Sequence, residues 1–168
     1  MLVGHSYAGM VVTGVADAMR DRIASLVYLD AFVPQDGQAL FDLLPPGVPR
    51  AAPMAGSDWL TEPLPPEVFG RVSETIRNFS EHKCFPQPTA CFTQPLRITG
   101  AVDRIRPRTY IYCNDPHPTT FTPFYERLRT RPDWIVRTLP CGHIAQLDLP
   151  NELAELLLQA VPEGGPRR

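Results

Sequence analysis

The first residues of the chain place a serine in a pattern that can make it a nucleophile. In Gly4-His5-Ser6-Tyr7-Ala8-Gly9, small residues flank Ser6, with Ala8 where glycine is usual and Gly9 directly after it. Small neighbours permit a very sharp turn from strand to helix, which lifts the serine hydroxyl clear of the sheet edge. By chance this pattern arises in at least about one chain in ten of this size, so its context decides its weight. An apolar run precedes it and an apolar helical pattern follows, which is the context that such a turn requires.

A histidine near the other end of the chain is the candidate general base. His143 follows Cys141-Gly142 on a predicted loop, after an apolar stretch at 134–139 and before the last predicted helix. A lone histidine is more often structural than catalytic. The order serine, acid, histidine along the chain is that of a strand–turn–helix serine hydrolase, however, and it favours a catalytic His143.

Two aspartates compete for the role of the acid that orients this histidine. Asp115 follows the predicted strand 109–113 and lies 28 residues before His143. Loops at the carboxyl ends of parallel strands converge at one edge of the sheet, so we expect Asp115 to meet the imidazole. The other interpretation of Asp115 is a turn residue, because Asn-Asp-Pro is a strong turn sequence. Asp30, at the end of the run 24–29, is the alternative acid.

Alternating strands and helices must position these residues. Residues 1–3 resemble the end of a buried strand, and the pattern predicts further strands at 24–29, 109–113 and 134–139. Helical spacing is predicted at 7–20, 120–129 and 151–160, before a C-terminal tail that we expect to be frayed. This alternation predicts an α/β domain with about four mainly parallel strands and helices on the faces of the sheet.

The segment 32–96 interrupts this alternation and is predicted to be a cap-like insertion in the single domain. Its many prolines exclude a strand of the central sheet, because proline lacks the N–H and fixes φ. Short helices are predicted at 38–44 and 67–81. Aromatic side chains argue against a disordered linker; they are Trp59, Phe69, Phe79, Phe85 and Phe92.

Composition excludes several classes of partner. A formal net charge of −2 favours neither nucleic acid nor an anionic membrane surface. No stretch approaches the roughly 20 apolar residues that span a bilayer, and the first residues lack the basic region of a signal peptide. The four cysteines show no metal-binding spacing, so we expect free thiols, a cytoplasmic protein, and neither metal nor organic cofactor.

Several segments together resemble a known family. LVGHSYAGM, LVYLDAFVPQDGQALFDLL, RTYIYC and GHIAQLDLPNELAELLL are similar to bacterial esterases of the α/β-hydrolase superfamily, which resemble plant methylesterases and hydroxynitrile lyases. The resemblance implies Ser6 as nucleophile, His143 as base and the Tyr7 amide as an oxyanion donor. It places the acid shortly after TYIYC, which supports Asp115. The lyases carry lysine directly after the histidine, and Ile144 in that position argues against lyase activity.

These features together predict a serine carboxylic ester hydrolase that acts through an acyl-enzyme on a small, apolar ester. The resemblance also implies four strands and a second oxyanion donor before the serine turn. We therefore expect an N-terminally truncated chain whose rate is lower by about 10²–10³. The alternative is a catalytically weak or inactive hydrolase-like protein that binds a small ligand or a partner. An exposed sheet edge at residues 1–3 would favour a homodimer.

Overall fold

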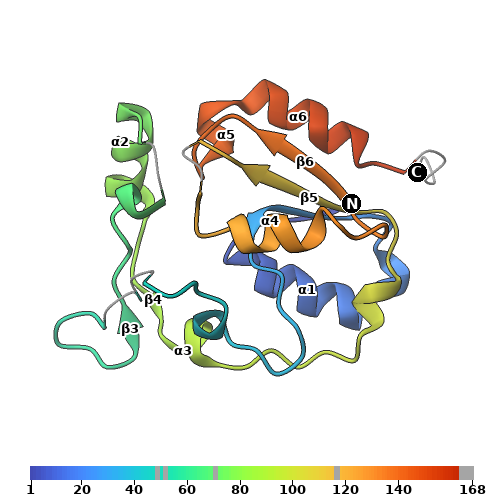
Figure 1. Cartoon of the computed structure of the whole chain (residues 1–168). Helices are drawn as coiled ribbons and strands as arrows, with labels where there is room; N and C mark the ends of the chain where they lie inside the picture. The colour runs from blue at the N-terminus through green and yellow to red at the C-terminus, as the bar shows by residue number, and fades with distance from the viewer. Residues whose placement is uncertain (48–49, 51–52, 70–71, 116–117, 163–168) are drawn as a thin grey trace.

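The computed structural model describes residues 1–47, 50, 53–69, 72–115 and 118–162, and its centre is a parallel sheet (Figure 1). Its four strands are β1 (Leu2–Ser6), β2 (Leu26–Ala31), β5 (Arg108–Cys113) and β6 (Ile135–Leu139). They lie in the order β1-β2-β5-β6, and every neighbouring pair is parallel. The prediction of an α/β fold with about four mainly parallel strands is therefore confirmed, and β1 lies at one end of this sheet.

Helices cover both faces of the sheet, as Figure 1 shows. On one face lie α1 (Ala8–Ala18) and α4 (Thr122–Leu128), and on the other α5 (Ala145–Asp148) and α6 (Pro150–Gln159). Side chains of β2 alternate between the two cores: Leu26 and Tyr28 join the first, Val27 and Leu29 the second. This burial on both faces explains why β2 is a continuous apolar run. The helices predicted at 7–20, 120–129 and 151–160 correspond to α1, α4 and α6.

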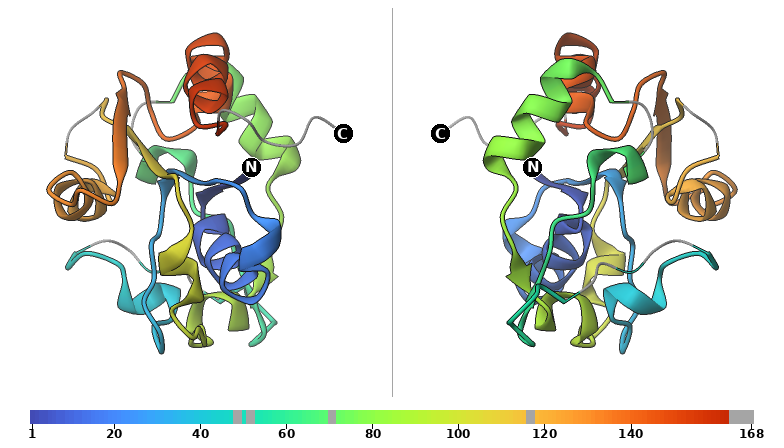
Figure 2. Two further views of the ribbon diagram at one scale, coloured as in Figure 1. Left: turned by 90° about the vertical axis from the view of Figure 1, so that its right-hand side faces the viewer. Right: turned by 90° about the vertical axis from the view of Figure 1, so that its left-hand side faces the viewer.

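The segment between β2 and β5 holds short elements beside the main sheet (Figure 2). Three are short 3-10 helices, at Leu40–Asp42, Pro66–Phe69 and Ala101–Arg104. The others are β3 (Leu60–Thr61), α2 (Glu74–Lys83), β4 (Gln87–Pro88) and α3 (Ala90–Thr93). The helix predicted at 67–81 therefore corresponds to two elements, the 3-10 helix Pro66–Phe69 and α2, with 70–71 outside the described residues. Strand β3 pairs antiparallel with β4. The predicted frayed tail lies, from residue 163, outside them as well.

None of the helices in the described residues has the length and apolar character needed to cross a membrane.

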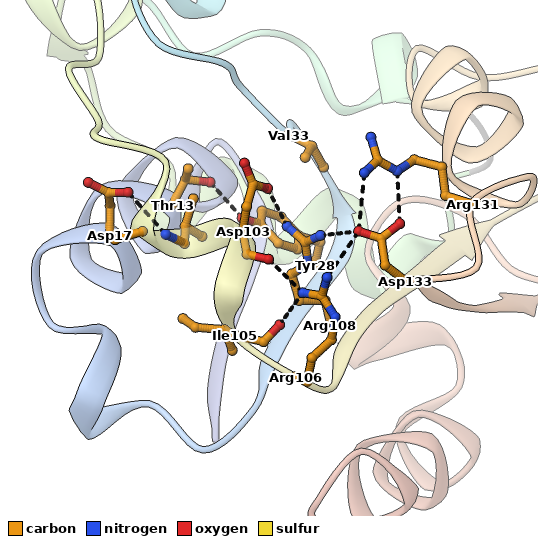
Figure 3. Close-up of polar contacts among 12 residues, drawn as sticks. Thr13, Asp17, Tyr28, Val33, Asp103, Ile105, Arg106, Arg108, Arg131 and Asp133 are labelled. Atoms are coloured by element: carbon orange, nitrogen blue, oxygen red, sulfur yellow. Dashed lines mark hydrogen bonds and ion pairs between the residues drawn. The ribbon is translucent and has the colours of Figure 1, made fainter.

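A buried arginine fixes the beginning of β5 (Figure 3). The Arg108 side chain is 4% exposed and donates to Asp103 at 2.6 Å and to Asp133. Its guanidinium also lies 4.6 Å from the centroid of the Trp134 ring. Asp133 accepts further hydrogen bonds from Arg131, so one carboxylate joins the start of β5 to the loop before β6.

We expect Asp133→Asn to remove a stabilising contribution that depends on pH. Hydrogen bonds from Arg131, and then the charges of Arg108 and Arg131, lower the pKa of Asp133 from 3.8 to about 2. A lowered pKa stabilises the folded state above the unfolded pKa, and this stabilisation is lost as pH falls through about 2. The variant should lose about 1–2 kcal/mol at pH 7, and the difference from wild type should shrink between pH 4 and 2. Urea unfolding across this pH range measures it.

The matched control is Asp58→Asn, at an exposed aspartate outside this cluster. An equal loss of unfolding free energy in both variants, or a difference that does not change with pH, would contradict the role assigned to Asp133.

Candidate active site

Ser6 lies at a strained turn between β1 and α1. Its φ of 57° is in the left-handed region, which residues other than glycine rarely adopt. The pairing of β1 with β2 shifts between His5 and Ser6, and α1 begins two residues later at Ala8. The strand–turn–helix that the sequence predicts is therefore present, and it places the Tyr7 amide at the amino terminus of α1.

The glycines around Ser6 are required by close approach. A Cβ at Gly9 would lie 2.0 Å from the carbonyl oxygen of Phe32, and one at Gly4 would lie 2.6 Å from a methyl of Val12. Backbone and core atoms leave no room at either position. Ala8, where the usual pattern has glycine, starts the helix. The turn thus keeps glycine at the two positions where a side chain would collide.

His143 lies on the loop after β6 and is held by two neighbours. Its Nδ1 forms a 2.7 Å hydrogen bond with Oδ2 of Asp30, and both side chains are almost completely buried. The ring of Phe121 stacks on the imidazole with centroids 4.8 Å apart and planes 7° from parallel. These contacts fix both the orientation and the plane of the imidazole.

The carboxylate at Nδ1 belongs to Asp30, the alternative acid, and not to Asp115, the acid that the sequence analysis favoured. An imidazole nitrogen makes one in-plane hydrogen bond, and Asp30 makes it here. Asp115 lies beside the same loop, since its N–H donates to the carbonyl of Cys141 at 3.0 Å. The Asp30–His143 hydrogen bond thus places the alternative acid at the ring nitrogen where Asp115 was expected.

Local backbone geometry explains how Asp30 reaches the histidine. Asp30 belongs to β2 and is 1% exposed, with a φ of 39°. This positive φ turns its side chain out of the regular alternation of the strand. The N–H of Cys113, at the end of β5, donates to Oδ1 of Asp30 at 3.2 Å. The carboxylate is therefore held from β5 while its other oxygen bonds to His143.

Burial opposes charge on both members of this pair. It lowers the pKa of His143 to about 3 and raises the pKa of Asp30 to about 7, with the Cys113 hydrogen bond acting against the second shift. His143 is therefore uncharged at neutral pH, which is the state that a general base requires. Because the two groups share a hydrogen bond, the steps in which their protons leave belong to the pair and not to either residue alone.

Ser6 opens onto an apolar cavity of about 370 Å³. The segment 32–96 supplies most of its wall, including Leu40, Phe41, Leu64, Phe85 and Phe92. The rings of Phe41 and Phe92 stack with centroids 5.5 Å apart. Phe32 also lines the cavity, and its ring meets the edge of Phe121, which stacks on His143. A continuous aromatic layer thus connects the cavity wall to the histidine.

The sequence analysis predicted that 32–96, with aromatics that include Phe85 and Phe92, is a cap-like insertion, but it did not identify Phe32 or Phe121 as part of a site. The only available signal was the density of aromatic residues in 32–96, which indicated a packed segment but not its contacts.

Comparisons with known proteins agree with this architecture. A model described as "Alpha/beta hydrolase family" matches residues 1–156. A carbendazim-hydrolysing esterase from Nocardioides sp. (strain SG-4G) is 40% identical, over 94% of this chain and 69% of its own length. The chain therefore belongs to the alpha/beta hydrolase family.

Solved structures show the same fold. A methylesterase from Arabidopsis superposes with a TM-score of 0.72 at 21% identity, over 96% of this chain and 69% of that one. A pyrethroid hydrolase from Sphingobium faniae JZ-2 gives a TM-score of 0.63 at 23% identity, over 94% and 69% of the two chains.

Proposed function

We propose that this chain is a serine carboxylic ester hydrolase that works through an acyl-enzyme. One observation carries the proposal: a serine on a strained turn opens onto an apolar cavity, and Asp30 at the end of β2 forms a buried pair with His143 on the loop after β6. A nucleophile, a base and an orienting acid are the three parts of a hydrolytic triad. The esterase relative at 40% identity supports the same chemistry.

In the proposed mechanism, Oγ of Ser6 attacks the ester carbonyl carbon while its proton passes to Nε2 of His143. Nδ1–H donates to Asp30, which stabilises the imidazolium that forms. The Tyr7 amide, at the amino terminus of α1, donates to the developing oxyanion. The intermediate collapses, and His143 returns the proton to the leaving alkoxide. Water then attacks the acyl group on Ser6 in the reverse sequence and releases the carboxylic acid.

The cavity suggests the class of substrate. Its wall is mostly apolar and aromatic, and a volume of about 370 Å³ accommodates only a small molecule. We propose a small ester with an apolar acyl or alcohol part, covered by the 32–96 segment as a cap-like insertion. Esters that carry a free carboxylate should bind poorly, because Glu62 is the acidic residue that lines the cavity.

A fluorophosphonate probe tests the proposal. It should phosphonylate Ser6 and no other serine, and peptide mass mapping should locate the adduct. Pre-incubation with a short-chain p-nitrophenyl ester should slow the labelling. A chain that is folded by circular dichroism but neither labels nor releases p-nitrophenol would support the alternative, a hydrolase-like binding protein.

A further inference from the structure

His5 joins the loops that carry the proposed nucleophile and base. It precedes Ser6 in the chain, and its Nε2 lies 2.8 Å from the carbonyl oxygen of His143. A carbonyl can only accept, so Nε2 carries the hydrogen and donates it. The two imidazole rings are also in contact, with centroids 4.4 Å apart and planes tilted by 36°. One side chain therefore holds the backbone of the histidine loop against the serine turn.

We propose that His5 is a positioning residue for the hydrolytic reaction: its Nε2–H fixes the His143 loop at the distance from Ser6 that proton transfer requires. The inference rests on the proposed function. This hydrogen bond reaches the backbone of His143 from β1, the strand that carries Ser6. A misplacement of about 1 Å between reacting groups costs about 10² in rate, so a single bond at this point has a large effect.

The charge state of His5 agrees with this role. Burial, and then the neighbouring His143, lower the pKa of His5 to about 4, although the hydrogen bond to the His143 carbonyl opposes the shift. His5 is thus uncharged at neutral pH. A charged ring 4.4 Å away would oppose the imidazolium that forms on His143 when it takes the serine proton. To position His143, the side chain at residue 5 therefore needs an uncharged hydrogen-bond donor at the place of Nε2, and it needs no charge.

Two amide variants separate positioning from general packing. The amide nitrogen of His5→Gln occupies the place of Nε2, whereas that of His5→Asn occupies the place of Nδ1 and cannot reach the carbonyl. We expect His5→Gln to keep kcat within about 3-fold of wild type, and His5→Asn and His5→Ala to lower it by about 10² with KM unchanged. Hydrolysis of p-nitrophenyl acetate, normalised to fluorophosphonate-titrated sites, measures each value.

Normalisation makes the outcomes decisive. A merely structural His5 would change the fraction of titrated sites and the melting temperature, but not kcat per site. Equal kcat for the Gln and Asn variants, or an undiminished kcat for His5→Asn, would overturn the inference while leaving the esterase proposal intact. If the Asn and Ala variants do not fold, His5→Gln decides alone, since a 10²-fold loss there contradicts the role. Wild-type protein without hydrolysis or labelling would instead refute the proposed function, and this inference with it.

Discussion

Replacement of Ser6 by alanine is expected to lower kcat for a short-chain ester by about 10⁶-fold. Alanine fits the turn sterically and removes only the hydroxyl. Because the positive φ of Ser6 is maintained by its surroundings and not by Oγ, the melting temperature should change little. Initial rates with p-nitrophenyl acetate, with wild type at the same concentration, measure the loss.

The matched control is Ser80→Ala, on α2 and outside the proposed site. It should keep wild-type kcat and label normally with the fluorophosphonate. If Ser6→Ala retains more than about 1% of wild-type kcat in a preparation free of contaminating esterase, Ser6 is not the nucleophile.

The fold could be predicted because each apolar run had the length of the element it forms. The run ending at Leu29 is buried on both faces as β2, and the helical spacing after Ser6 matches α1. These patterns depend on local spacing, which the sequence shows directly. Short elements such as α3 and α5 were not anticipated, because four residues are too few for a helical period to appear.

The site could be predicted only where it depends on local sequence. The small residues around Ser6 predict the turn, and the position of His143 before the last helix predicts that it lies on a loop. Asp30 was the weaker choice because nothing in VYLDA indicates a φ of 39° at its aspartate. Its carboxylate is held by a neighbour distant in sequence, the Cys113 amide, 83 residues further along the chain. The same holds for the cavity wall, whose residues meet only after 32–96 has folded against the turn.

Replacement of Asp30 by asparagine is expected to lower kcat by about 10⁴-fold, the loss seen when a triad acid becomes an amide. The amide can donate to Nδ1 of His143, which moves the imidazole hydrogen to Nε2 and prevents that nitrogen from accepting the serine proton. Asp115→Asn leaves the 2.7 Å contact between Asp30 and His143 unchanged, so its loss should be below about 10-fold. The reverse ranking would restore Asp115 as the acid.

The pH dependence of the same two variants gives an independent test. In wild type, kcat should rise with pH through about 7, because burial raises the pKa of Asp30 to that value and only the ionised carboxylate has the negative charge that stabilises the imidazolium. His143, whose pKa burial lowers to about 3, stays uncharged over this range. Asp115→Asn should keep this acidic limb and Asp30→Asn should lose it. Stability should follow the opposite sign: a raised pKa means that the folded state holds the Asp30 proton more tightly, so the contribution of Asp30 to the unfolding free energy falls as pH rises from about 4 to 7. The lowered pKa values of His143 and His5 contribute with the opposite sign in this range, so the measured quantity is the difference between wild type and Asp30→Asn. Asp30→Asn should lack this fall, because an amide does not ionise. If Asp30→Asn loses activity but becomes more stable relative to wild type as pH rises towards 7, the catalytic role of this carboxylate is separated from any role in folding.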